Sequence, residues 1–380
     1  MNPSPTVAIP IPVSRPVLGD LELEYVTRAL GEGAVSGFCG DYLARFEAEF
    51  AAFCGTAHGV AASSGTAALH LALLALSIGP GDEVLVSTLT NMATFFAVLY
   101  QRAIPIPIDV EEDTWNIDPA LLERRVTPRT RAIVVVHLFG HPVDMDPVME
   151  VARRHGLKVV EDCAQAHGAL YKGRRVGSIG DVGCFSFYAN KIITTGEGGM
   201  ITTRNRRLAD RARSLKNLAF GQPNKFMHTE VGFNYRMTNL QAALGCAQLQ
   251  RIDALIEQKR QIARWYGEQL SELRNLKLPV EKSYAKNVYW MYHVELTGAD
   301  AYRRDAVMRA LADEGIETRQ GFVPANLQRI FQREPWARAS SCPKANRASG
   351  SSFYLPSGCS TSAADVQRVT TALRQILESR

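Results

Sequence analysis

The chain has 380 residues, of which 46% are hydrophobic and 21% are charged, and its formal net charge is +5. These values are typical of a folded globular protein that is long enough for two domains and a large buried core. They exclude a disordered chain, and so mild a charge gives little support to nucleic-acid binding. The densest basic stretch, residues 202–217, has apolar residues at helical spacing and predicts one solvated helix face.

The seven cysteines are odd in number and scattered, and no two of them form a C-x-x-C pair. This pattern argues against a disulfide framework and against a zinc site, and it favours the reducing cytoplasm. The start of the chain lacks a cationic n-region and is interrupted by prolines, so it does not resemble a signal peptide. The longest apolar helical run, residues 67–78, is too short to span a bilayer. We therefore expect a cytoplasmic protein that binds no metal and no membrane.

Between residues 65 and 203, short apolar segments alternate with segments of helical length. The helical segment 145–156 ends at Gly156, a residue typical of helix C-caps. The alternation predicts a mostly parallel sheet covered on both faces, with ligands at the carboxyl ends of its strands. Four segments rich in valine and isoleucine predict its buried strands: residues 83–87, 104–109, 132–137 and 157–162.

The pattern changes at Thr238. Thr238 and Gln241 have the spacing of a capping box, which predicts a long helix that reaches about Leu273 with room for one break. Three further elements are expected: a strand at 287–296 and helices at 305–316 and 362–380. We interpret this as a smaller α+β domain at residues 251–380, joined to a large domain at 16–250, with an N-terminal extension at 1–15.

Ser63, Ser64, Gly65 and Thr66 come directly before the apolar helical run. Small residues at a helix N-terminus leave backbone N–H groups free to bind an anion, and the helix dipole favours negative charge there. A simple N-cap by serine or threonine explains the same residues. Neither a Walker loop nor a G-x-G-x-x-G fingerprint opens a helix in this sequence, which disfavours a dinucleotide site.

Asp162 and Lys191 are charged residues in surroundings that do not suit unpaired charges. Asp162 ends an apolar strand, where a carboxylate needs a cation or good hydrogen bonds, and a structural salt bridge would serve as well as a ligand. Lys191 follows another short apolar strand and precedes a glycine-rich turn. An amine acts as a nucleophile only when burial or neighbours disfavour its charged form. An anion-binding turn, a strand-end aspartate and a lysine, in that chain order, are what a pyridoxal-phosphate enzyme of fold type I requires.

The motifs around these residues resemble those of the DegT/DnrJ/EryC1/StrS sugar aminotransferase family, from roughly Pro16 to the C-terminal helix. The resemblance is carried by SSGTAAL, VHLFGHPVDMD, VVEDCAQAHGA, GDVGCFSFYANK, TTGEGG and GFNYRMTN. It implies the type I fold, an α/β fold with a mostly parallel seven-stranded sheet in the large domain and a smaller C-terminal α+β domain. It also implies pyridoxal 5'-phosphate as cofactor and a homodimer with active sites shared between the subunits.

The resemblance assigns residues to the cofactor ring. Lys191 would form the Schiff base and act as the catalytic residue, and Asp162 would keep the pyridine nitrogen protonated. Gln165 would reach the phenolic oxygen, and Ala164 would pack on the ring. Asn91 stands where the family usually has a stacking aromatic residue, so its amide would cover the ring instead.

The resemblance also assigns residues to the anionic groups of the ligands. Gly65, Thr66 and Ser186 would hold the cofactor phosphate, joined by Asn234 from the partner subunit. Arg236, in the same loop as Asn234, would lie near the sugar nucleotide or the carboxylate of the amino donor.

The motifs ANKIITTGEGGM and VGFNYRMTNLQAALG are most similar to the branch of the family that aminates C4. This implies transfer of an amino group from L-glutamate to a nucleotide-linked 4-keto-6-deoxy sugar, above all GDP-4-keto-6-deoxy-D-mannose. A dTDP- or UDP-linked keto sugar, aminated at C4 or C3, is the alternative. A more distant alternative is a non-catalytic regulator, although no helix-turn-helix with a basic recognition helix is evident.

Other residues suggest readings that the pattern does not favour. His137 and His141 could be catalytic bases, but strand-end histidines satisfied by the backbone are the better expectation. Tyr188 and Lys191 are three residues apart, whereas the tyrosine–lysine pair of short-chain dehydrogenases is four apart on a helix, so we reject that class. A related branch that dehydrates the sugar carries histidine in place of the lysine, and Lys191 argues against it.

Overall fold

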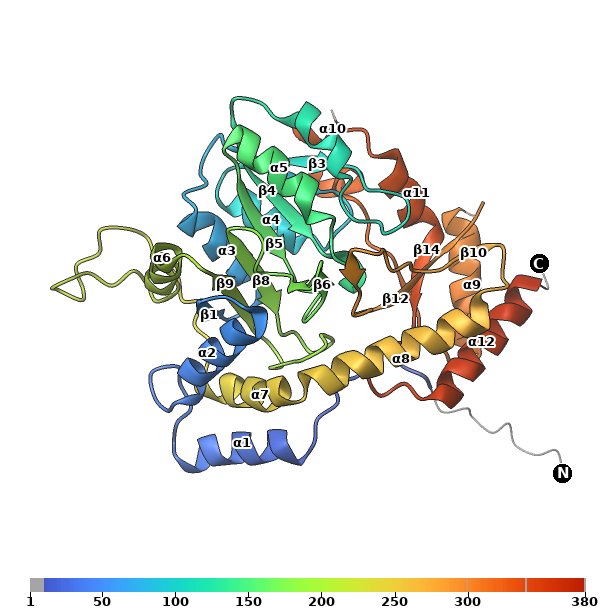
Figure 1. Cartoon of the computed structure of the whole chain (residues 1–380), viewed down its shortest axis with the longest axis horizontal. Helices are drawn as coiled ribbons and strands as arrows, with labels where there is room; N and C mark the ends of the chain where they lie inside the picture. Colours follow the sequence, from blue (N-terminus) through green and yellow to red (C-terminus); the bar gives the residue numbers. More distant parts are fainter. Residues whose placement is uncertain (1–9, 299, 339, 379–380) are drawn as a thin grey trace.

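The computed structural model of the chain describes residues 10–298, 300–338 and 340–378. It contains a seven-stranded sheet, a four-stranded sheet and a small three-stranded sheet. Helix α8 (Ile252–Leu270) runs beside the larger part and continues along the C-terminal part, so that it connects the two (Figure 1). The expected α/β fold with a smaller α+β part is confirmed. The boundary between residues 250 and 251 stays a prediction.

The large sheet is mostly parallel, as the sequence predicts. In spatial order its strands are β1 (His58–Ala62), β9 (Gly199–Thr203), β8 (Val182–Ser186), β5 (Lys158–Asp162), β4 (Thr130–Val136), β2 (Glu83–Ser87) and β3 (Ile104–Ile108). Only β9 is antiparallel to both of its neighbours. The four predicted strands are found as β2, β3, β4 and β5, with ends shifted by at most two residues.

Helices cover both faces of this sheet. One face packs against α3 (Gly65–Ala75), α4 (Ala93–Tyr100) and α6 (Arg206–Lys216), and the other against α2 (Tyr42–Cys54), α5 (Met145–His155) and α7 (Asn239–Gln250). Successive side chains of a strand point to opposite faces of the sheet and so pack against both helical layers. In β2, Val84 and Val86 belong to the hydrophobic cluster on the α3 side, and Leu85 belongs to the cluster on the α5 side. Gly156 ends α5 with φ 65°, the left-handed C-cap that its sequence position predicts.

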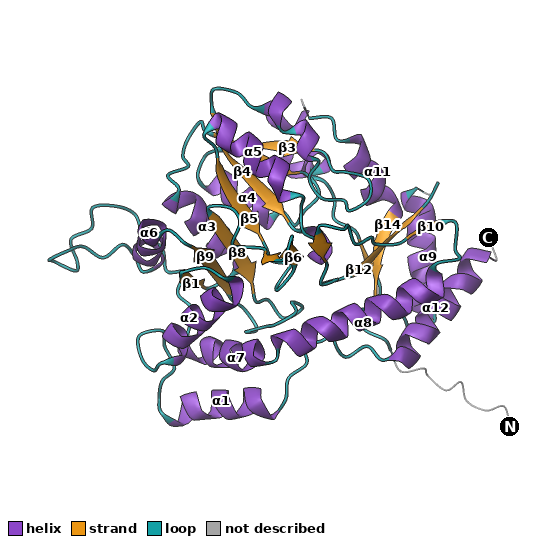
Figure 2. Cartoon of the chain, in the orientation of Figure 1, coloured by secondary structure: helices purple, strands orange, loops and turns teal. Residues whose placement is uncertain are grey.

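The C-terminal part is built on the four-stranded antiparallel sheet. Its order is β10 (Leu276–Lys277), β12 (Tyr292–Leu296), β14 (Ser352–Leu355) and β13 (Arg319–Gln320). Helices α8, α9 (Ala301–Asp313) and α12 (Ala363–Glu378) lie near this sheet (Figure 2) and share one hydrophobic cluster with it. The three-stranded sheet pairs β11 (Ala285–Lys286) with β6 (Leu170–Tyr171), which also pairs with β7 (Arg174–Arg175), and so ties the two parts together.

The remaining elements are short or peripheral. They are α1 (Asp20–Gly31), α10 (Pro335–Arg338), α11 (Pro343–Ser351), and the 3-10 helices η1 (Pro119–Leu121), η2 (Glu123–Arg125), η3 (Leu138–Gly140), η4 (Ala325–Leu327) and η5 (Arg329–Phe331). Ahead of α1, the chain packs on the C-terminal part: Ile11 forms a bridge with Ile316, and Val13 accepts a hydrogen bond from the N–H of Ser357. Residues 1–9 of the expected N-terminal extension lie outside the described residues.

The long helix is found with one break. Thr238 Oγ1 accepts a hydrogen bond from the N–H of Gln241, and Gln241 Oε1 accepts one from the N–H of Thr238, which completes the predicted capping box. The helix is interrupted at Arg251, which separates α7 from α8. The basic stretch around α6 has the expected solvated face, because Arg206 and Arg207 are exposed while Ala209 is buried.

Two predicted boundaries are wrong. The strand expected at 287–296 forms only from Tyr292, because Tyr289 has φ 48° and Val288 donates its N–H to the carbonyl of Gly140 instead of to a sheet neighbour. The helix expected at 305–316 begins earlier, where Asp300 caps the N–H of Arg303. Among the described residues, no helix combines the length and the apolar character that a membrane crossing requires.

Candidate active site

A pocket of about 380 Å³ lies where strands of the large sheet end and the C-terminal part packs against them. Its walls come from the N-terminus of α3, the ends of β5 and β8, the Lys191 loop and the C-terminal sheet. The lining residues are Ser64, Gly65, Thr66, Leu69, Asn91, Ala93, Asp162, Ala164, Gln165, Ser186, Tyr188, Asn190, Lys191, Glu197, Trp290, Arg319, Phe322 and Tyr354. Eight of the ten residues that the sequence singled out are therefore in one place.

Asp162 ends β5 and is 5% exposed. Its Oδ2 accepts a hydrogen bond from Thr94 Oγ1 at 2.8 Å, and its Oδ1 accepts one from the N–H of Ala164 at 3.1 Å. Burial raises the pKa of Asp162, while these two hydrogen bonds and the Lys191 ammonium oppose the rise. The carboxylate keeps unused acceptor capacity toward the pocket, which suits a cationic nitrogen.

Lys191 is partly buried in the loop that follows β8. Burial lowers the pKa of Lys191 to about 8, and the Asp162 carboxylate opposes this shift. The Nζ atom lies 4.0 Å from the centroid of the Trp290 ring. About a tenth of the amine is therefore unprotonated at pH 7, far more than for a free lysine, and the neutral form is the one that a nucleophile or general base requires.

The turn before α3 is packed closely against the end of β8. Ser64 caps the helix by accepting a hydrogen bond from the N–H of Ala67. A Cβ on Gly65 would lie only 2.7 Å from the Cβ of Ser186, so this approach requires glycine. Gly65, Thr66 and Ser186 thus meet on one wall with the N-terminus of α3, an arrangement that favours an anion. The N-cap, one of the two explanations that the sequence allowed, is found here, and anion binding by the same turn stays a prediction.

Gln165, Ala164 and Asn91 complete the part of the pocket expected for a ring. Gln165 is buried and its Oε1 accepts a hydrogen bond from the N–H of Phe139 at 2.7 Å, which fixes the side chain. Asn91 is exposed and its Oδ1 accepts a hydrogen bond from the N–H of Ala93, at the start of α4.

Asn234 and Arg236 do not line the pocket of their own chain. Asn234 is exposed in the protruding loop after α6 and forms a backbone bridge with Asn217 (Figure 1). Arg236 donates a hydrogen bond to Asn217 Oδ1 at 2.8 Å and lies 5.1 Å from the centroid of the Phe38 ring. Of the expected site residues, these two stand apart from the other eight.

The histidines have structural partners, as expected. His137 Nδ1 accepts a hydrogen bond from the N–H of Val143 while Nε2 contacts Glu161, and His141 Nε2 accepts one from the N–H of Lys282. His137, Glu161 and Cys163 are close enough to hold a metal ion. However, Glu161 also accepts hydrogen bonds from three backbone N–H groups of residues 177–180, so its oxygens and the histidine are already used.

Several pocket residues were not predicted from the sequence. Trp290, Arg319, Phe322 and Tyr354 come from the C-terminal part and line the wall opposite the sheet. Their local patterns carry no signal of a site, since Trp290 lies in a segment whose apolar pattern predicted a strand. Only the packing of the two parts brings these side chains to Lys191.

The sequence profile of the DegT/DnrJ/EryC1/StrS aminotransferase family matches residues 16–374. The chain is 43% identical over 370 residues to GDP-perosamine synthase of Caulobacter vibrioides, which covers 97% of this chain and 98% of that protein. It is 39% identical to dTDP-3-amino-3,4,6-trideoxy-alpha-D-glucose transaminase of Streptomyces venezuelae, over 93% of this chain and 91% of that protein.

The solved structures agree with these relatives. The aminotransferase TlmJ from Streptoalloteichus hindustanus superposes with a TM-score of 0.90 at 32% identity, over 97% of this chain and 99% of that one. The profile match, the identities and the superposition all span nearly the whole chain. The protein therefore belongs to the DegT/DnrJ/EryC1/StrS aminotransferase family and is an aminotransferase of the kind that uses pyridoxal 5'-phosphate.

Proposed function

We propose that the protein transfers an amino group from L-glutamate to C4 of GDP-4-keto-6-deoxy-D-mannose and forms GDP-perosamine. The observation that carries the proposal is the convergence of Lys191, Asp162 and the Gly65 turn in one pocket, in a chain 43% identical to a GDP-perosamine synthase. The product of the amino donor is 2-oxoglutarate.

The residues of the pocket fit pyridoxal 5'-phosphate. Gly65, Thr66 and Ser186 with the N-terminus of α3 would hold its phosphate, and the spare acceptor capacity of Asp162 suits its ring nitrogen. Gln165 and Ala164 would contact the ring. When bound, the cofactor supplies an electron-withdrawing ring that eases removal of a proton from the carbon bearing nitrogen.

Lys191 has two roles in this proposal. Its Nζ would hold the cofactor, and the same amine would take up and return the proton of the substrate carbon during amino transfer. The lowered pKa of Lys191, about 8, keeps enough neutral amine for both roles. Asp162 contributes by holding a positive charge on the ring nitrogen, and the closely packed Gly65 wall orients the phosphate.

The choice of C4 and of GDP rests on the relatives and the motifs rather than on a geometric feature of the pocket. A sugar diphosphate is anionic, and Arg236, in the loop that contains Asn234, offers positive charge for it. The relative that is a dTDP-3-amino sugar transaminase supports the second candidate, amination of a dTDP-linked sugar at C3.

We also propose that the protein works as a homodimer in the reducing cytoplasm. Exposed apolar side chains gather on the loops near Asn234, among them Val35, Phe38 and Val231, and burial in a partner would remove them from water. A partner would also give Asn234 and Arg236 a pocket to enter. The seven free cysteines suit a reducing compartment.

The test is product analysis with L-glutamate and a panel of GDP-, dTDP- and UDP-linked 4-keto-6-deoxy sugars. The proposal predicts the highest kcat/KM for GDP-4-keto-6-deoxy-D-mannose, with nitrogen at C4 of the product. A clear preference for a dTDP- or UDP-linked sugar, or nitrogen at C3, would refute the substrate. Purified protein supplied with pyridoxal 5'-phosphate should show a visible absorption band that shifts when glutamate is added. Absence of such a band would refute the proposed aminotransferase activity itself.

A further inference from the structure

A second lysine is buried behind the pocket. Lys259 lies in the middle of α8 and is 4% exposed. Its Nζ donates a hydrogen bond to the backbone oxygen of Trp290 at 2.7 Å and another to the backbone oxygen of Ser357. Within the described residues no carboxylate forms an ion pair with it, and burial lowers the pKa of Lys259 to about 8. Because a buried amine is costly unless its donors are used, these two bonds hold both carbonyls firmly.

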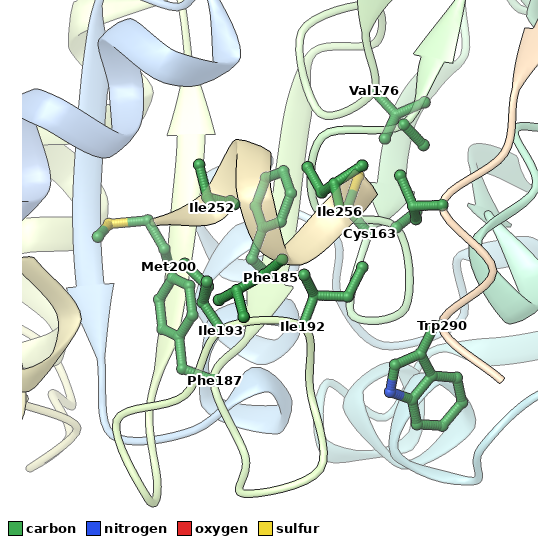
Figure 3. Close-up of a cluster of buried hydrophobic side chains, with 14 of the residues drawn as sticks. Cys163, Val176, Phe185, Phe187, Ile192, Ile193, Met200, Ile252, Ile256 and Trp290 are labelled. Carbon is green, nitrogen blue, oxygen red and sulfur yellow. The ribbon is translucent and has the colours of Figure 1, made fainter. Parts of the chain in front are cut away.

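Trp290 connects this lysine to the reacting one. Its backbone oxygen accepts from Lys259, and its indole Nε1 donates to the backbone oxygen of Asn190 at 2.8 Å. Asn190 directly precedes Lys191, whose Nζ lies 4.0 Å from the centroid of the indole ring. Trp290 and Ile192, the residue that follows Lys191, belong to one buried cluster, part of which is drawn in Figure 3. Trp290 therefore contacts the backbone before Lys191 and the amine itself.

The space behind Lys191 is closed. A cavity of about 10 Å³, enough for one water molecule, is lined by Asn190, Lys191, Lys259 and Trp290 among others. This narrow space offers the side chain of Lys191 much less room than the pocket on its other side. Its free movement is toward the pocket of about 380 Å³ on the other side. The indole of Trp290 thus limits movement of the Lys191 amine on the side away from the large pocket.

These contacts go beyond what core packing requires. A tryptophan that only filled space would need one partner for its N–H, and any carbonyl would serve. Here the backbone oxygen, the indole N–H and the ring face of Trp290 all take part in one chain of contacts from α8 to Lys191. The ring face also attracts the protonated amine, and a fixed starting position is what a group that moves a proton needs.

We propose that Trp290 is a positioning residue for the amine of Lys191, and that Lys259 acts on the reaction by holding Trp290 in place. The proposal rests on the assignment of Lys191 as the reacting lysine, and it assigns a part in the chemistry to α8, although no residue of that helix lines the pocket. It requires no particular nucleotide sugar.

The first test uses cofactor-free protein and measures how fast Lys191 is acetylated by acetic anhydride over a pH series, read by peptide mass spectrometry. The limiting rate at high pH reports access to the amine rather than its pKa. Trp290→Leu and Lys259→Met are expected to raise that rate about fivefold or more, because the indole no longer covers one side of the neutral amine and the reagent reaches it more easily. Trp265→Leu is the matched control, since it removes another tryptophan, one that lies on α8 as Lys259 does and does not line the pocket. Unchanged rates in both variants would overturn the proposal.

The second test measures the single-turnover rate at which glutamate reacts with cofactor-loaded enzyme. The observed amplitude is divided by the amount of bound cofactor, so that each variant is compared per loaded site. Trp290→Leu is expected to slow the step by about tenfold to a hundredfold, and Trp290→Phe, which keeps a ring face, by less. Lys259→Met is expected to slow the step in the wild-type background and to add nothing in the Trp290→Leu background. If the rate of the double variant fell by the product of the two single-variant losses, Lys259 would act independently of Trp290, and its assigned role would be overturned.

The two tests separate this proposal from the proposed function. If no nucleotide sugar is aminated, the substrate assignment fails while the acetylation result and the glutamate step remain interpretable. Where Lys259→Met does not fold, as judged by its thermal unfolding curve, Lys259→Gln keeps an amide donor for one of the two carbonyls and takes its place. A lower Tm with wild-type acetylation and turnover would mean that Lys259 is structural only.

Discussion

At the scale of single residues, the site combines groups whose burial disfavours their charged forms. Burial raises the pKa of Asp162 and lowers the pKa of Lys191 to about 8. Each group partly offsets the shift of the other, because an opposite charge favours ionisation. A buried lysine with a lowered pKa costs the folded state stability, and such a cost is common where an amine has to react.

This cost can be measured in cofactor-free protein by comparing Lys191→Met with the wild type. The pKa of Lys191 is about 8 in the folded state against 10.5 as reference, so between these values the unfolded chain binds more protons and wild-type stability rises with pH. The variant should therefore be more stable by about 1–2 kcal/mol below pH 8, since solvent access to the pocket reduces the upper bound of about 3 kcal/mol. Its advantage should fall as pH rises through that window.

Urea unfolding at several pH values checks this prediction, with Lys286→Met as a control at an exposed lysine. An advantage of the variant that grew with pH would contradict a lowered pKa of Lys191 in the folded state.

Arg319 supports a prediction about the amino donor. Of the lining residues, only Lys191 and Arg319 are cationic, and Lys191 is the residue that we propose reacts with the cofactor. Arg319 is about half exposed and pairs with Glu317 at 3.2 Å, so its charge is available to an anionic ligand. Arg319→Gln should raise the KM for L-glutamate about tenfold with little change in kcat, because one charge-assisted hydrogen bond to a carboxylate is lost.

Steady-state kinetics with both substrates varied provides the measurement. Arg329→Gln is the control, since Arg329 is exposed and does not line the pocket. A rise in the KM for the sugar nucleotide alone would assign Arg319 to the diphosphate instead.

At the scale of elements, the contact between α3 and β8 decides whether the anion-binding turn keeps its shape. Gly65→Ala would place a Cβ 2.7 Å from the Cβ of Ser186, so one of the two elements must move. We expect a loss of about 1–3 kcal/mol in the free energy of unfolding, typical of overpacking, and a cofactor affinity lowered about tenfold or more. Thermal unfolding and titration with pyridoxal 5'-phosphate measure the two effects.

Gly79→Ala provides the comparison, because a Cβ there meets nothing within 4 Å. Equal effects of the two substitutions would remove the argument from close packing.

At the scale of the whole molecule, the position of Asn234 bears on the assembly, because this residue is exposed and does not line the pocket of its own chain. If it completes the pocket of a partner, Lys191→Ala and Asn234→Ala chains should each be inactive alone. A purified heterodimer of the two should recover about half of the wild-type activity, since one of its two sites would be intact. Differently tagged chains allow the heterodimer to be isolated and assayed. Heterodimers that form without regaining activity would rule out the shared site.

Elements with strong local signals could be predicted from the amino-acid sequence. Strands β2 to β5 were predictable because a strand buried on both faces must be a continuous apolar run. The end of α5 and the start of α7 were predictable from Gly156 and from Thr238 with Gln241, since capping is decided within a few residues. Asp162, Lys191 and the Gly65 turn were recognisable because each ends or begins such an element.

The opposite wall of the pocket depends on tertiary packing. Trp290 and Arg319 reach Lys191 only because the C-terminal sheet packs against the large one. The strand expected at 287–296 fails for the same reason: Val288 donates its N–H to Gly140 of the large part, and this long-range bond outweighs the local apolar pattern. The buried Lys259 likewise has no local signature, since helical spacing places it among core positions but cannot name the carbonyls that it meets. Contacts between residues far apart in the chain depend on how whole elements pack, and no short stretch of sequence contains that information.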